Sequence, residues 1–186
     1  MDARARLLAL LTDRSFARRR VVLASGKESD FFIDCKQTVL TAQGHALVGE
    51  LMLDALSALP PCVAVAGVEL GGCPLASAVS LVSFVRNKPL DAVYVRKEAK
   101  DHGSKRLLEG NAQLAPGAAV VILEDVVTTG GSSLAAIQRC QEFGLVVTRV
   151  IAIIDRMEGG AQAFARRGFP LASLLTIRDF GIEPPT

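Results

Sequence analysis

Four apolar runs without alternation of apolar and polar residues constrain the fold of this chain more than any other feature. They are rich in valine and isoleucine and span residues 63–66, 92–95, 118–123 and 146–154. Such a run is typical of a strand buried on both faces, as in a parallel sheet covered by helices. Helical patterns separate the runs, over about 44–59, 74–85 and 133–143. This order predicts an α/β fold with right-handed crossovers.

The first forty residues follow a different pattern. Residues 1–11 carry arginines ahead of a short leucine-rich run and predict an amphipathic helix rather than a signal peptide. Residues 21–23 and 31–34 flank a segment, 24–27, that is typical of a turn between two short antiparallel strands. We therefore expect residues 1–40 to form a small N-terminal hood on a core of residues 41–186, within one structural unit.

The composition argues against several classes of protein. The chain has 21 basic and 19 acidic residues, a net charge of +2, whereas a general nucleic-acid-binding protein is markedly basic. No apolar run approaches the length needed to cross a bilayer. Cys35, Cys62, Cys73 and Cys140 have no metal-ligand spacing. We expect reduced core thiols, a cytoplasmic location and no metal site built from protein ligands.

A pair of carboxylates before a glycine- and hydroxyl-rich segment carries the clearest functional signal. Glu124 and Asp125 follow the third apolar run, and residues 126–133 lead into a predicted helix. Ligands of an open α/β sheet bind beyond the carboxyl ends of the strands, so both carboxylates are expected at the mouth of a site. Carboxylates accept hydrogen bonds from sugar hydroxyls, while backbone N–H groups and a helix N-terminus cradle phosphate. The segment predicts a ribose 5-phosphate site; the alternative is a plain strand–helix turn with Ser132 or Ser133 as N-cap.

The usual motifs of other nucleotide-binding proteins do not occur in the sequence. A P-loop requires Gly-x-x-x-x-Gly-Lys-Ser/Thr, and a dinucleotide fold requires Gly-x-Gly-x-x-Gly after a strand. Neither pattern is found, which argues against a P-loop kinase, an ATPase and a dinucleotide-dependent enzyme.

The same segment resembles a known family signature. Residues 120–132 are similar to the signature of type I phosphoribosyltransferases for 5-phosphoribosyl 1-pyrophosphate (PRPP). Residues 96–103, Arg-Lys-Glu-Ala-Lys-Asp-His-Gly, resemble the mobile catalytic loop of one branch, the orotate phosphoribosyltransferases, as do residues 25–32 and 155–156. The resemblance covers nearly the whole chain. It implies a type I phosphoribosyltransferase core, with a central, mainly parallel sheet flanked by helices, plus the hood.

The resemblance also implies an activity. The chain is expected to be a glycosyltransferase that moves the 5-phosphoribosyl group from PRPP to orotate, giving orotidine 5′-monophosphate and pyrophosphate in pyrimidine biosynthesis. Magnesium is expected to be carried mainly by PRPP and pyrophosphate oxygens. A homodimer is implied in which the basic loop of residues 97–110, with Arg96 before it, forms a lid shared between subunits, with no nucleic-acid or membrane partner. The alternatives are a purine phosphoribosyltransferase and a non-catalytic regulator that binds PRPP or a nucleotide on the same fold.

Two groups of residues are expected to bind the substrates. The PRPP group lies in the lid and the strand–helix segment: Arg96, Lys97, Lys100, His102, Glu124, Asp125, Val126, Val127, Thr128, Thr129, Gly130, Gly131 and Ser132. The orotate group comprises Lys27, Phe31, Phe32, Thr128 and Arg156. Lys100, Asp125 and Glu124 are expected to be catalytic. The lysine meets the charge of departing pyrophosphate, and the carboxylates favour a cation-like sugar.

These assignments have structural alternatives. The lid has the composition of a solvated loop, with His102 an exposed histidine. Phe31 and Phe32 are equally suited to fill the core beneath the hood. Arg156 would pair with the orotate carboxylate, or instead with Asp155 or Glu158.

Two positions depart from the family pattern. Many orotate enzymes have lysine where Ala24 and Gly71 stand in this chain. We expect backbone N–H groups of residues 70–72 to bind pyrophosphate in place of one lysine, and Lys27 to replace part of the missing charge. The alternative for residues 70–74 is a plain strand–helix turn with Pro74 at the first helical position.

Overall fold

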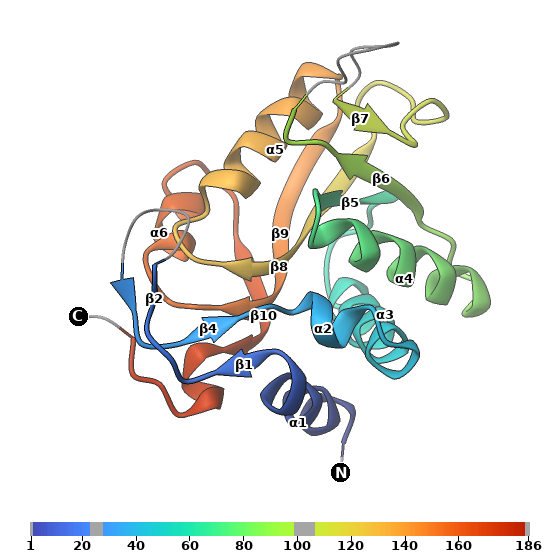
Figure 1. Ribbon diagram of the computed structural model, residues 1–186. Coiled ribbons are helices and arrows are strands. Elements are labelled where there is room, and N and C mark those ends of the chain that lie inside the picture. The colour runs from blue at the N-terminus through green and yellow to red at the C-terminus, as the bar shows by residue number, and fades with distance from the viewer. Residues whose placement is uncertain (1, 23–27, 99–106, 185–186) are drawn as a thin grey trace.

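A six-stranded sheet organises the computed structural model, which describes residues 2–22, 28–98 and 107–184 (Figure 1). The strands are β5 (Ala64–Val68), β6 (Asp91–Val95), β7 (Leu108–Glu109), β8 (Ala119–Val127), β9 (Val146–Asp155) and β10 (Leu171–Thr176). Their order across the sheet is β10-β9-β8-β5-β6-β7. All neighbours are parallel except the antiparallel pair β6 and β7. The predicted α/β fold with a mainly parallel sheet is confirmed.

Both faces of the sheet are covered, which explains the unbroken apolar runs. The helices are α1 (Ala3–Arg14), α2 (Lys36–Val39), α3 (Ala42–Ser57), α4 (Gly72–Val85), α5 (Gly131–Glu142) and α6 (Gly160–Ala165), with a short 3-10 helix η1 (Ile177–Phe180). Val121 and Leu123 pack into the core formed with α1, α3 and α4, whereas Val120 and Ile122 pack against α5 and α6. In Figure 1, α3 and α4 lie on one side of the sheet, and α5 and α6 lie on the other.

The predicted strands are confirmed, but the end predicted for the third was wrong. β8 does not stop at Leu123: it continues to Val127, because Val126 and Val127 pair with Ile154 and Asp155 of β9. The two carboxylates at 124 and 125 therefore lie within the strand. The sequence prediction also missed β7, which has two residues, and β10, an edge strand that is mostly half-buried.

The strand pairing predicted for the hood was wrong. β2 (Val21–Val22) pairs with β3 (Glu28–Ser29), and β4 (Phe32–Ile33) pairs instead with β1 (Phe16–Ala17). The aromatic rings explain the second pair, because Phe16 lies between Phe31 and Phe180, at centroid distances of 6.2 and 5.2 Å. The predicted first helix is confirmed as α1.

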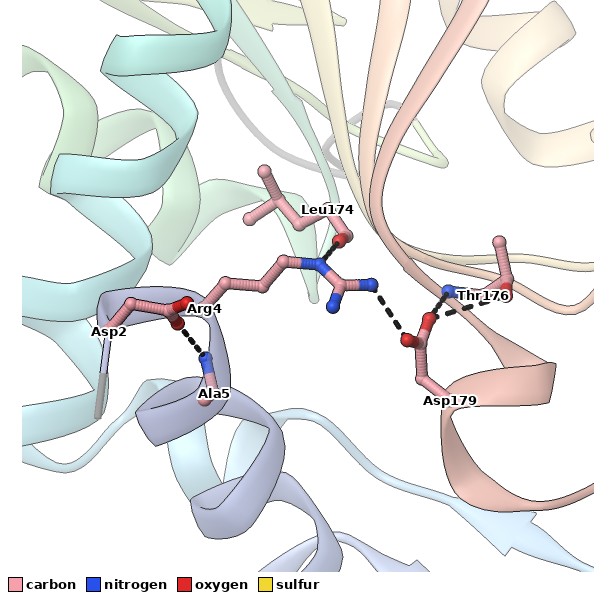
Figure 2. A network of polar contacts seen from close by, with 6 residues as sticks. All are labelled: Asp2, Arg4, Ala5, Leu174, Thr176 and Asp179. Carbon is pink, nitrogen blue, oxygen red and sulfur yellow. Dashed lines mark hydrogen bonds and ion pairs between the residues drawn. The ribbon is translucent and has the colours of Figure 1, made fainter.

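A polar network ties the hood to the C-terminal part of the chain. Figure 2 shows Arg4 of α1 donating to the carbonyl oxygen of Leu174 at 2.9 Å and to the Asp179 carboxylate at 2.7 Å. Asp179 in turn accepts from the backbone N–H of Thr176 at 2.7 Å. Residues separated by more than 150 positions in sequence are thus fixed side by side. Among the described residues, no helix is both long and apolar enough to span a bilayer.

Candidate active site

The candidate site lies where four parallel strands end. Residues 69–71 follow β5, residues 96 and 97 follow β6, the loop 128–130 follows β8, and Arg156 follows β9. Because parallel strands share one carboxyl edge, these segments meet there. The sheet thus brings together predicted site residues that are more than 80 positions apart in sequence.

The two carboxylates have different environments. Glu124 is 5% exposed, and its carboxyl accepts hydrogen bonds from Ser133 Oγ at 2.9 Å and Ser132 Oγ at 3.4 Å. Burial, reinforced by the charge of Asp125, raises the pKa of Glu124 to about 8. Asp125 is more exposed and borders a cavity of about 330 Å³. Burial and the neighbouring carboxylate therefore favour the protonated form of Glu124.

The loop between β8 and α5 has the backbone of a phosphate cradle. Gly130 precedes α5 with a φ of 81°, and a Cβ at this position would lie 2.9 Å from the ring of Phe164. Only glycine fits both constraints. Gly130 is also the N-cap of α5, so the alternative of Ser132 or Ser133 as N-cap was wrong. With no side-chain cap, the first N–H groups of α5 remain available for an anion.

The 330 Å³ cavity, which we call the acidic cavity, joins β8 to the ends of β5 and β6. Besides Asp125, its lining includes Lys36, Glu69, Gly71, Lys97 and Ser132. A Cβ on Gly71 would overlap the Asp125 carboxylate, so a side chain at position 71 would displace this group.

An arginine outside every motif holds the base of the lid. Arg139 of α5 donates from Nη1 to the carbonyl oxygen of Arg96 at 2.8 Å and from Nη2 to that of Lys97 at 2.7 Å. The N–H of Lys97 donates to Glu69 Oε2 at 2.9 Å. These bonds fix the point where the chain leaves β6. The sequence analysis missed Arg139, because nothing in a helical pattern shows that a side chain reaches backbone 43 residues away.

A second cavity, of about 660 Å³, lies between the hood and the end of β9. We call it the hood cavity; Phe31 and Arg156 both line it. The Arg156 guanidinium lies 4.2 Å from the centroid of the Phe31 ring and donates to Ser29 Oγ at 3.2 Å. It also forms the ion pair considered as its alternative, with Nε 2.7 Å from Glu158 Oε1. The hood cavity thus offers an aromatic face and a buried cation together.

The other predicted substrate-binding residues either have a second role in packing or lie outside the described part of the chain. Phe32 packs its ring against Arg19, whose guanidinium lies 5.3 Å from the ring centroid. Phe31 is also part of the apolar core, as its alternative proposed. Lys27, Lys100 and His102 lie outside the described residues. Within the described ranges, no three acidic, histidine or cysteine side chains gather in a way that could hold a metal ion.

The fold and the site define a class of protein that comparison also finds. Residues 48–174 match the phosphoribosyl transferase domain, and the chain belongs to that family. High similarity is found to members of one branch. The orotate phosphoribosyltransferase of Sorangium cellulosum is 66% identical over 182 residues, covering 98% of this chain and 95% of the relative.

Solved structures agree with this placement. Orotate phosphoribosyltransferase from Mycobacterium tuberculosis, in complex with Fe(III) dicitrate, has a TM-score of 0.83 and 36% identity, over 97% of this chain and all of the other. The same enzyme in complex with PRPP has a TM-score of 0.79 and 32% identity, with the same coverage. Within the wider family, the chain therefore belongs with the orotate phosphoribosyltransferases.

Proposed function

We propose that this chain transfers the 5-phosphoribosyl group from PRPP to orotate and releases pyrophosphate, as a step of pyrimidine biosynthesis. The observation that carries the proposal is the meeting of an acidic cavity, a phosphate loop and an arginine–aromatic cavity at one edge of the sheet. The identity of 66% to a relative named for this reaction supports the choice of acceptor.

The ribose of PRPP binds at Asp125. The Asp125 carboxylate accepts hydrogen bonds from the ribose hydroxyls. It also stabilises the positive charge that develops at the anomeric carbon as pyrophosphate leaves. Glu124 helps to hold this arrangement in place, since its buried carboxyl accepts a hydrogen bond from Ser133 Oγ. The 5-phosphate binds to backbone N–H groups at residues 128–132 and at the N-terminus of α5. The PRPP complex of the Mycobacterium tuberculosis enzyme supports PRPP as the donor.

The largest change in charge during the reaction occurs on the departing pyrophosphate. Lys97 borders the acidic cavity, and Lys100 and His102 are assigned to pyrophosphate by the family resemblance. The hydrogen bonds that Arg139 donates and the one that Glu69 accepts fix residues 96 and 97, where the lid begins. The family resemblance assigns the rest of the lid to closing over the sugar. Closure excludes water, which would otherwise attack the sugar. Asp125 is the carboxylate that would lie nearest to a magnesium ion carried by PRPP, and such an ion would neutralise part of the pyrophosphate charge.

Orotate binds as an anion in the hood cavity. The Phe31 ring offers an apolar surface for the planar pyrimidine, and Arg156 pairs with its carboxylate. Glu158 and Ser29 hold the guanidinium in position before the substrate arrives. Orotate is already ionised at neutral pH, so the reaction needs no general base from the protein.

The chain acts as a homodimer in which the lid completes the neighbour's site. Support comes from α4, where Leu81, Phe84 and Val85 are between 62% and 72% exposed, although half of the helix residues are buried. An apolar surface of this kind is typical of a subunit interface. The four cysteines are all free, which supports a reducing compartment such as the cytoplasm.

Mixed dimers test the shared site. Lys100→Ala and Asp125→Asn chains are unfolded and refolded together in equal amounts, so that about half of the dimers are mixed. If the lid acts across the dimer, each mixed dimer has one intact site, and activity returns to roughly a quarter of wild type. If the lid acts on its own subunit, every site keeps a defect. A mixture that stays inactive despite proven subunit exchange contradicts the shared site and leaves the reaction unaffected.

Acceptor choice tests the reaction itself. Purified protein is incubated with PRPP, magnesium and either orotate, adenine or hypoxanthine, and loss of orotate absorbance is followed in the ultraviolet. The proposal predicts turnover with orotate and pyrophosphate release in equal amounts, with neither purine accepted. Turnover of a purine in preference to orotate would refute the assignment of the hood cavity.

A further inference from the structure

A lysine from the hood reaches the acidic cavity. Lys36 is the first residue of α2, directly after the segment that follows β4, and it borders the cavity opposite the strand ends. Its Nζ lies 2.5 Å from Asp34 Oδ1, and the two side chains are 38% and 19% exposed. Asp34 itself is held by Gln37, whose Nε2 donates to Asp34 Oδ2 at 3.1 Å. Lys36 is thus a positioned cation on the wall of the site, and no motif predicted it.

Lys36 places a positive charge at the edge of the acidic cavity. The hydrogen bond to Asp34 raises the pKa of Lys36, although burial acts in the opposite direction, and the charge of Asp125 raises it further. Lys36 therefore stays protonated throughout the physiological range. Gly71 also lines the cavity and offers only backbone, since the Asp125 carboxylate fills the space that a side chain would take. Among the described lining residues, Lys36 and Lys97 are the cations of this cavity.

We propose that Lys36 binds the diphosphate group of PRPP and of the product pyrophosphate, an inference that rests on the proposed function. In this arrangement the 5-phosphate binds at the α5 end of the β8–α5 loop. The ribose lies between the 5-phosphate and the diphosphate, with its hydroxyls at Asp125. Gly71 and Lys97 line the acidic cavity together with Asp125, so a group on the anomeric carbon of a ribose held at Asp125 would lie beside them. The Lys36 ammonium either moves from Asp34 to the phosphate oxygens or contacts both groups at once. This role does not require a side chain at position 71.

Calorimetry on binding alone tests this inference. Titrations use PRPP with magnesium, pyrophosphate with magnesium, and ribose 5-phosphate, which lacks the diphosphate. Lys36→Met should weaken PRPP and pyrophosphate binding about tenfold or more, the scale of a lost hydrogen bond to a charged group. Ribose 5-phosphate affinity should change less than twofold, and Lys36→Arg should recover most of the loss. Lys88→Met is the matched control, since Lys88 is exposed and lies outside the acidic cavity.

The outcomes separate this inference from the proposed function. Unchanged affinity of Lys36→Met for PRPP and pyrophosphate overturns the role of Lys36 and leaves orotate transfer standing. Equal weakening of ribose 5-phosphate also overturns it, because that pattern indicates a general structural effect. If wild type binds pyrophosphate through Lys36 but does not turn over orotate, the inference about the diphosphate site survives and the acceptor assignment fails. Wild type that binds neither diphosphate contradicts both.

Discussion

Replacing Glu124 with glutamine tests how burial controls charge at the site. The structure raises the pKa of Glu124 from 4.5 to about 8, first through burial and then through Asp125. Between these values the folded protein binds a proton that the unfolded chain has released. The free energy of unfolding should therefore fall as the pH rises from 4.5 to about 8. At full titration this rise in pKa corresponds to at most roughly 5 kcal/mol.

Urea unfolding of both proteins between pH 5 and 8.5 measures this effect. Glutamine keeps the size of the side chain and an oxygen that accepts from Ser133, but it cannot ionise. The two proteins should have similar unfolding free energies at pH 5. At pH 8.5 Glu124→Gln should be more stable than wild type by about 2–5 kcal/mol, because only wild type has a buried charge to accommodate. Other titrating groups cancel in the difference. A difference that is constant with pH, or that favours wild type at pH 8.5, would refute the reasoning.

Three further substitutions address binding and stability. Arg156→Ala should weaken orotate binding by about 1.5–3 kcal/mol in calorimetry with PRPP affinity nearly unchanged, because a charge-assisted hydrogen bond is lost; equal weakening of both ligands would mean that the residue is structural. Gly130→Ala should lower the free energy of unfolding by about 1–2 kcal/mol for its positive φ and by more for the contact with Phe164. Gly168→Ala has a similar φ of 80° in open space, so an equal loss in both variants would contradict the contact with Phe164. Arg139→Gln should raise the KM for PRPP and lower kcat while orotate affinity is retained, since the base of the lid loses two hydrogen bonds; unchanged kinetics would exclude its positioning role.

The main elements of the fold were predictable because their signals are local. The apolar runs that became β5, β6, β8 and β9 need only a sheet with both faces covered, and the helices between them follow their own periodicity. The end of β8 was not predictable in this way. Its last residues carry two carboxylates, and they remain in the strand only because β9 pairs with them.

Features that depend on contacts distant in sequence escaped the prediction. The β1–β4 pair of the hood lies where Phe16 packs between Phe31 and Phe180, a contact that no local pattern shows. Glu124 and Asp125 are neighbours in sequence and both line the acidic cavity, yet only the fold shows that Glu124 is buried and Asp125 is more exposed. The same holds for Arg139 and Lys36, which are ordinary residues of helical segments until the fold places them.

The kinetics of Asp125→Asn test the central claim most directly, since this carboxylate is assigned to the developing charge of the sugar. Asparagine keeps the size of the side chain and removes its charge. The account predicts that kcat for orotate and PRPP falls about 10²–10³-fold, while PRPP affinity changes only a few-fold. Asp91→Asn, an exposed carboxylate at the opposite end of a strand, should behave as wild type. A kcat for Asp125→Asn equal to that of wild type would contradict the account.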